Sequence, residues 1–195
     1  MTDDILTQPA VNTLQLQPSM RGTRSPDNDG YDTLVQDSLR REDIKMVVED
    51  GPDLKLRLAE ITAAVNPLLA AASPLLCALA QMPRELSPGF VEHYRALLER
   101  EVRRYQTLCD QANLRREHVL AVRYCVCTAL DEAANNTVWG RRGVWAGKSL
   151  LVTFHGESEG GIKLFQIIGR LAASFQEHSD VLEIIYHILG LGFEG

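Results

Sequence analysis

One stretch of the sequence resembles a phosphate-binding loop: "WGRRGVWAGKSLLVTF", residues 139–154. In a P-loop, glycines curl the backbone around a phosphate, and a final Gly-Lys-Ser supplies the side chains that reach the phosphate and Mg²⁺. Lys148 and Ser149 match that ending, but Arg142 stands where the first glycine should be. A P-loop also follows a buried strand, whereas helical residues precede this stretch. We therefore interpret Ser149 as the N-cap of a short helix over "LLVTF", after a glycine-containing loop.

A second stretch, "FHGESEGG" at residues 154–161, places His155, Glu157 and Glu159 where they could bind a metal. The zincin pattern His-Glu-x-x-His is absent, and a zinc deaminase needs a later Pro-Cys-x-x-Cys. Glu157, Ser158 and Glu159 instead precede a helix expected to begin at Gly161. There the carboxylates and the hydroxyl would accept hydrogen bonds from its free N–H groups, and the negative charge would stabilise the positive end of the helix dipole. We expect no catalytic residue, cofactor or metal site. The alternative is a small nucleotide- or metal-dependent enzyme that uses the AGKS or HGESE stretch.

The third candidate is "ALDEAANNTVWG", residues 129–140. Asp131 and Glu132 fall in the last turns of a predicted helix, where a negative charge costs about 0.3–1 kcal/mol. A solvated edge, or an ion pair with Arg123 or a loop arginine, is one explanation. The other is a partner-binding surface, since Trp with Arg is typical of interface hot spots. Its residues would be Asp131, Glu132, Asn135, Asn136, Trp139 and Trp145. For the two tryptophans, packing of the loop on the core is as good an explanation as contact with a partner.

The overall charge and the cysteines limit the class of protein. The 195 residues carry a net charge of −6, which argues against broad nucleic-acid binding. The four cysteines show no CxxC pair, so we expect reduced, buried thiols in a cytosolic domain. The acidic start, "MTDDILTQPAVN", is not a signal peptide.

The apolar patterns predict helices throughout the second part of the chain. Residues 61–82 carry no charge but include Asn66-Pro67 and Ser73-Pro74, which favours a buried, broken helix with two starts over a membrane span. Helical spacing continues from Pro88 to Cys109, from about Arg116 to Ala134, from Gly161 to about Phe175, and after a cap at Ser179 or Asp180. The fold class is all-α, with about six to eight helices.

The first part of the chain has a different composition. Residues 1–54 are rich in polar residues, Pro and Gly, which predicts a disordered or loosely attached tail with a possible short helix from Asp32 to Arg41. The helical domain is expected to span residues 55–195. The sequence stops directly after "LGLGFEG", which we interpret as a truncated protein.

Four blocks in order resemble one family: "NPLLAAASPLL" at 66–76, "RYCVCTALDEAANNTVWG" at 123–140, "SLLVTFHGESEGGIKLFQIIGRL" at 149–171 and "LEIIYHILGLGFEG" at 182–195. They are similar to the TssL (DotU/IcmH-like) family of bacterial type VI secretion. The resemblance implies two small helical bundles in a hook-like arrangement, without enzymatic activity. It also implies a C-terminal transmembrane helix, absent from this sequence, that anchors the domain at the cytoplasmic face of the inner membrane.

The resemblance further implies partners and partner-binding residues. The expected partners are TssM and the lipoprotein TssJ in the membrane complex, and TssK and TssE in the cytoplasmic baseplate; a homodimer is also possible. The matching positions include Asp131, Glu132, Asn136, Trp139, Trp145 and Glu157. Val138 replaces a proline that is frequent in the family, and Glu159 replaces an aromatic residue, which puts a partner contact there in doubt.

Overall fold

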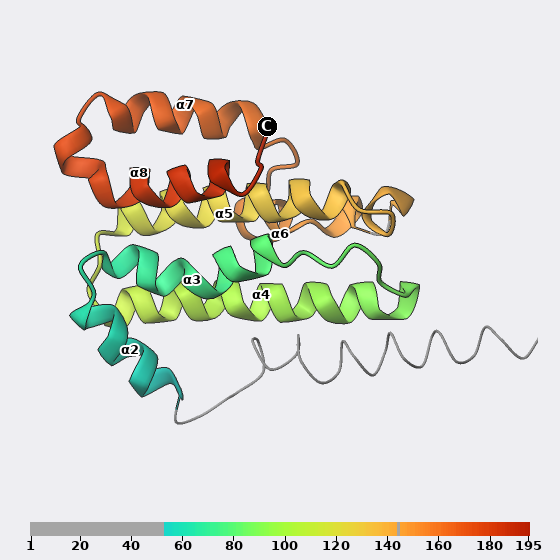
Figure 1. Cartoon of the computed structure of the whole chain (residues 1–195), viewed down its shortest axis with the longest axis horizontal. Coiled ribbons are helices and arrows are strands. Elements are labelled where there is room, and N and C mark those ends of the chain that lie inside the picture. Colours follow the sequence, from blue (N-terminus) through green and yellow to red (C-terminus); the bar gives the residue numbers. More distant parts are fainter. Residues whose placement is uncertain (1–52, 144) are drawn as a thin grey trace, which may run out of the picture. The chain divides into compact units, whose positions relative to one another are not determined.

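The computed structural model describes residues 53–143 and 145–195, and every regular element in these ranges is helical. The α-helices, with the labels of Figure 1, are α2 (Asp53–Ala63), α3 (Pro67–Ala80), α4 (Pro88–Gln111), α5 (Arg116–Asn135), α6 (Leu150–His155), α7 (Gly161–Ala172) and α8 (Phe175–Gly190). Two 3₁₀ turns, η3 (Gly140–Arg142) and η4 (Ala146–Lys148), lie between α5 and α6. The predicted all-α fold is confirmed.

Helix α3 covers most of the uncharged segment at residues 61–82 for which a membrane span was the alternative. The Asn66 side chain accepts a hydrogen bond from the Leu69 N–H, so the predicted cap and proline start are confirmed. The predicted second start at Ser73-Pro74 is wrong, because Pro74 lies inside a continuous helix. Burial of its apolar residues against neighbouring helices offsets the hydrogen bond that a proline removes. Among the described residues, no helix combines the length and the apolar character needed to cross a bilayer.

Helix α5 lies at the centre of the described helices and contacts α3, α4, α6, α7 and α8. In Figure 1 it runs between α3 and α4 on one side and α7 and α8 on the other. Val122, Cys125, Val126 and Leu130 are fully buried, as its nearly all-round apolar pattern predicts. A residue on α5 can therefore connect several helices at once.

The last two helices differ from the predicted boundaries. Helix α7 ends at Ala172, and α8 begins at Phe175, before the predicted cap at Ser179 or Asp180. His178 has non-helical φ and ψ of −118° and 15°, so α8 is kinked there. The predicted start marks the kink, after which the helix is regular to Gly190.

The remaining sequence predictions have mixed outcomes. Cys109, Cys125 and Cys127 are free and buried, but the prediction of burial is wrong for Cys77, which is exposed. The buried apolar side chains from α2 to α8 form one cluster. The hook-like arrangement of two bundles stays a prediction. The predicted tail and the short helix at 32–41 lie outside the described residues, apart from Asp53 and Leu54, with which α2 begins.

Candidate functional site

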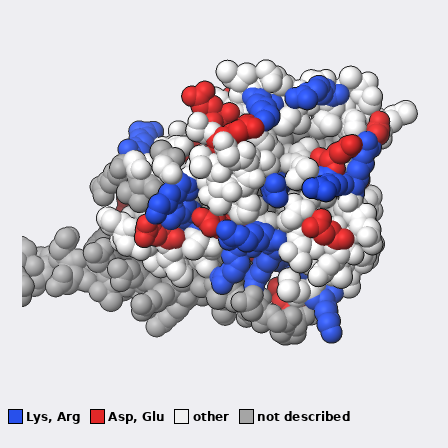
Figure 2. Space-filling model, turned by 180° about the vertical axis from the view of Figure 1, so that it is seen from behind, with Lys and Arg blue, Asp and Glu red and all other residues white. Residues whose placement is uncertain are grey.

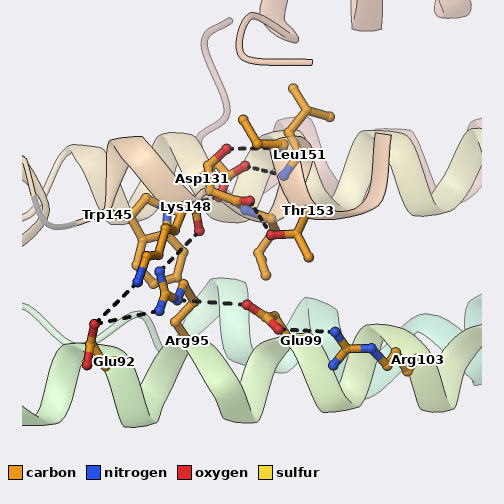
Figure 3. Close-up of polar contacts among 12 residues, drawn as sticks. Glu92, Arg95, Glu99, Arg103, Asp131, Trp145, Lys148, Leu151 and Thr153 are labelled. Atoms are coloured by element: carbon orange, nitrogen blue, oxygen red, sulfur yellow. Dashed lines mark hydrogen bonds and ion pairs between the residues drawn. The ribbon is translucent and has the colours of Figure 1, made fainter. Parts of the chain in front are cut away.

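The carboxylate of Asp131 connects α5 to the segment that follows it (Figure 3). One oxygen accepts hydrogen bonds from the Trp145 Nε1–H and the Leu150 N–H, both at 2.9 Å, and the other accepts from the Leu151 N–H at 2.7 Å. Asp131 is only 7% exposed. Burial raises the pKa of this carboxyl above its usual value, while the three hydrogen bonds oppose that rise. The charge near the end of α5 is thus offset by donors at the start of α6, and not by an arginine.

The two tryptophans pack the same segment against the core, and Trp139 contacts α4. Trp139 and Trp145 are 3% and 0% exposed, and their rings meet edge to face with centroids 5.5 Å apart. Tyr94 of α4 contacts the Trp139 ring edge to face, and the Trp139 Nε1–H donates to the Pro83 carbonyl at 2.8 Å. The sequence left open whether the tryptophans contact a partner or pack on the core. Both side chains pack on the core.

A glycine fixes where this segment leaves α5. A Cβ at Gly140 would lie 1.9 Å from the Ala134 carbonyl oxygen, so only glycine fits. The Thr137 hydroxyl donates to the same carbonyl and accepts from the Gly140 N–H at 3.0 Å. Ser149 ends the segment as the N-cap of α6, where its hydroxyl accepts from the Val152 N–H. The predicted cap is confirmed. We call residues 136–149 the loop segment.

The outer side of the loop segment carries exposed polar and apolar groups. Lys148 lies 3.8 Å from the Glu92 carboxylate, and the Arg95 guanidinium donates to the Lys148 carbonyl at 3.5 Å (Figure 3). Asn136 is exposed, and Val138 is 63% exposed beside a groove of about 260 Å³ that Glu85 and Trp139 also line. A buried inner side thus holds an accessible outer side in place.

Two further predicted residues lie away from the loop segment. The half-buried Glu132 accepts hydrogen bonds from the Glu194 and Gly195 N–H groups, both at 2.8 Å. Glu157 accepts from the Tyr124 hydroxyl at 2.9 Å and pairs with Lys163, and these hydrogen bonds lower its pKa. Helix α7 has no side-chain cap, so the expected capping role of Glu157 is wrong. Glu132 and Glu157 hold other segments to α5 and do not join the loop segment.

The stretches that suggested enzyme chemistry contact side chains of neighbouring helices. Residues 146–148 form the 3₁₀ turn η4 next to α4, with Lys148 paired to Glu92. The His155 ring accepts from the Arg123 Nε–H at 3.4 Å and stacks edgewise on Tyr124. No group of three metal-binding side chains occurs within 53–143 or 145–195.

Sequence reasoning missed the α4 residues that contact the loop segment. Glu92 and Arg95 come from α4, about 50 residues before Lys148, and no local pattern connects them to it. It also missed the tight contact of Gly160 with Thr128, where a Cβ would lie 2.5 Å from the threonine hydroxyl. Such pairs are visible only once the helices are packed.

Charge is mixed over the surface that the structure describes. On the face shown in Figure 2, Lys and Arg side chains gather near the middle, with Asp and Glu side chains among them. The net charge of −6 therefore does not make this face uniformly acidic. A partner of either charge could find a complementary region.

Comparison with known proteins identifies the family. Residues 67–195 match the family described as type VI secretion system protein DotU. The crystal structure of TssL from Vibrio cholerae is similar at 33% sequence identity and a TM-score of 0.60, over 67% of this chain and 80% of that one. No curated protein matches the sequence significantly. The buried loop-segment anchors and the exit of α5 lie within the matched region, and the chain belongs to the DotU family of type VI secretion system proteins.

Proposed function

We propose that this chain is a non-enzymatic structural component of the type VI secretion membrane complex, and that it docks the cytoplasmic baseplate through protein–protein contacts. The outer side of the loop segment makes the contact. The buried residues Asp131, Trp139 and Trp145 act by holding that surface in one conformation. A pre-organised surface binds with a smaller entropic cost than a mobile one.

The observation that carries this proposal is the difference between the two sides of the loop segment. Its inner side is fixed by the hydrogen bond from Trp145 to Asp131 and by the tryptophan pair, and the same carboxylate accepts two hydrogen bonds from the start of α6. Its outer side leaves Val138 and Asn136 in solvent. An exposed apolar side chain beside a groove is a usual anchor point for a partner.

The proposed partners and location follow from the family. TssK and TssE of the baseplate are the candidates for the loop segment, and TssM with TssJ for the rest of the membrane complex. We expect the protein at the cytoplasmic face of the inner membrane, with an anchoring helix outside the sequence described. Self-association remains a further expectation.

Binding of purified TssK and TssE tests the proposal directly. Val138→Asp places a charge beside the groove and should weaken binding at least about tenfold, as loss of an interface anchor does. Val65→Asp is the matched control, because Val65 is fully exposed in the turn between α2 and α3. Biolayer interferometry gives both affinities. Equal binding by both variants and the wild type, with unchanged thermal melting, would remove the loop segment as the docking surface.

Charge reversal of Asp131 is a poor test of the same surface. A lysine there would leave three donors facing a buried cation, so the protein would lose stability before it lost a contact. Exposed residues such as Val138 and Asn136 separate binding from folding.

A further inference from the structure

A groove of about 620 Å³ lies between α5, the end of α6 and α7, away from Val138. Its apolar floor includes Leu120 of α5, and Ile167 and Leu171 of α7. All three side chains are half-buried, so each keeps apolar surface in contact with water. The volume lies in the range typical of binding sites.

Helix α7 supplies the more open wall of the groove. Its only fully buried side chain is Leu164, although its apolar stripe is pronounced. It packs on α5 and α8, which leaves the stripe only partly covered. From Lys163 to Leu171 the wall is about 12 Å long at 1.5 Å per residue, which suits two to three turns of another helix.

The charged groups of the lining are all cationic. Arg123, Lys163 and Arg170 line the groove, and none of its lining residues is an Asp or Glu. Arg170 is exposed on α7. Lys163 pairs with Glu157 outside the lining, and its ammonium lies 4.8 Å from the Tyr124 ring centroid. In a protein of net negative charge, this groove is a local site of positive potential.

The hydrogen bonds of Arg123 leave its charge uncompensated. Its guanidinium donates to the Gln106 side-chain oxygen at 3.0 Å, to the His155 ring at 3.4 Å and to the Phe154 carbonyl at 3.4 Å. All three acceptors are neutral, since burial and Arg123 lower the pKa of His155 to about 4. Arg123 is thus oriented by neutral groups, and no carboxylate of the described residues pairs with it.

From this arrangement we propose that the groove binds an acidic amphipathic helix of a partner protein. Apolar side chains on one face of that helix cover Leu120, Ile167 and Leu171, and its flanking carboxylates pair with Arg170, Lys163 and Arg123. This is the helix-in-groove mode of recognition, with electrostatic complementarity at the rim. The inference does not depend on the loop segment as a docking site.

The same geometry disfavours a nucleic acid or a membrane surface. A single-stranded nucleic acid is bound by stacking on open aromatic faces, but Arg103 and Arg123 already lie 5.4 and 5.9 Å from the Phe154 ring centroid. A flat bilayer would touch the rim cations and leave the apolar floor uncovered. An amphipathic helix satisfies both the floor and the rim.

A synthetic peptide tests the chemistry of the groove. The probe is a fluorescein-labelled helix of about four turns, with leucines at i, i+3, i+4 and i+7 spacing and glutamates on the other face. One control peptide has the same composition without the stripe, and a second has lysines in place of the glutamates. Fluorescence anisotropy should show binding of the probe that weakens with salt, and at least about tenfold weaker binding of both controls.

Single substitutions assign the binding to the groove. Arg170→Glu should weaken probe binding at least about tenfold and improve binding of the lysine peptide, because the rim charge is reversed. Lys55→Glu, at an exposed position on α2 outside the groove, is the matched control and should bind the probe as the wild type does. Equal effects of the two substitutions, or equal binding of the probe and either control peptide, would overturn the proposal.

Crosslinking in cells identifies the class of the occupant. A benzophenone amino acid in place of Leu120 in the full chain should crosslink to a protein segment with an apolar stripe and net negative charge. Arg170→Glu should abolish that crosslink. Absence of a crosslink, or adducts with lipid, RNA or a basic segment, would contradict the proposal.

Discussion

The carboxylate of Asp131 and the indole of Trp145 meet at 2.9 Å, and this hydrogen bond joins the end of α5 to the loop segment. The same carboxylate binds the first two N–H groups of α6. One acidic side chain on a central helix thereby sets the position of the C-terminal part of the segment that we propose as a docking surface and of the start of α6. The first prediction concerns this link.

Replacing Asp131 by asparagine should lower the free energy of unfolding by about 1–3 kcal/mol. The amide oxygen can accept two of the three hydrogen bonds, but the amide nitrogen then faces a third N–H group. Asp110→Asn is the control: Asp110 is exposed on α4 and accepts one hydrogen bond from Gln106, so its loss should cost less than about 0.5 kcal/mol. Urea titration followed by circular dichroism measures both; equal stability of the two variants would contradict the role of Asp131.

Glycine substitutions test the geometry of the loop segment. Gly140→Ala should cost at least about 2 kcal/mol, because the new Cβ would overlap the Ala134 carbonyl. Gly147→Ala should change stability by less than about 0.5 kcal/mol, since nothing lies within 4 Å of its Cβ. Differential scanning calorimetry of the pair decides the point. If Gly140→Ala and Gly147→Ala have the same melting temperature, the backbone after α5 can move to accept a Cβ at position 140, which would contradict the prediction.

The sequence predicted the loop segment in part. Ser149 could be recognised as a cap from its place before "LLVTF", because capping depends on residues three apart. The role of Asp131 could not, because its partners Trp145, Leu150 and Leu151 lie 14 to 20 residues away. From sequence alone, an acidic residue at a helix end is predicted to be exposed, because the hydrogen-bond donors that would bury it come from distant residues.

The helices, too, could be predicted where adjacent residues decide the structure, but not where distant residues do. The start of α3 was predictable from Asn66-Pro67, which acts through adjacent residues. Pro74 gave an equally strong local signal, but burial of α3 among its neighbours kept the helix continuous. The site prediction has the same limit, since the DotU resemblance pointed to Trp139 and Trp145 but not to their burial.

Glu101 should be essential for holding α2 to α4. It is 2% exposed, bonds to Arg57 of α2 at 2.6 Å and lies 3.6 Å from the Arg104 guanidinium. Glu101→Gln should cost about 3 kcal/mol, because it removes the buried carboxylate that pairs with the Arg57 guanidinium between α2 and α4. Hydrogen exchange should also show that α2 opens first.

The neighbouring Glu99 provides the control for Glu101. It is half-buried and pairs with Arg103 at 3.2 Å, so Glu99→Gln should cost no more than about 1 kcal/mol. Equal losses from both substitutions, without faster exchange in α2, would show that the buried pair does not hold the helix.

His155 should make the free energy of unfolding depend on pH. Burial and Arg123 lower its pKa to about 4, with Glu157 and Lys163 also facing the ring. Between about pH 6.5 and pH 4 the unfolded state binds more protons than the folded state, so stability should fall as the pH falls. Because the ring keeps some contact with water, we expect about 1 kcal/mol over this window.

The His155→Gln variant isolates that contribution, because a glutamine oxygen can still accept from Arg123. Urea titrations of both proteins across the window should give a shallower pH dependence for the variant. His93→Gln, at an exposed position on α4, should follow the wild type. Parallel curves for wild type and His155→Gln would contradict the prediction.

Hydrogen–deuterium exchange with and without bound TssK or TssE tests the central claim most directly, because it reports which residues a partner covers. If the loop segment docks the baseplate, amides within residues 136–149 and around Glu85 and Glu92 should exchange more slowly in the complex. Val65 and its turn should exchange unchanged. Binding of both proteins without slower exchange in residues 136–149, or with protection confined to other helices, would contradict the account.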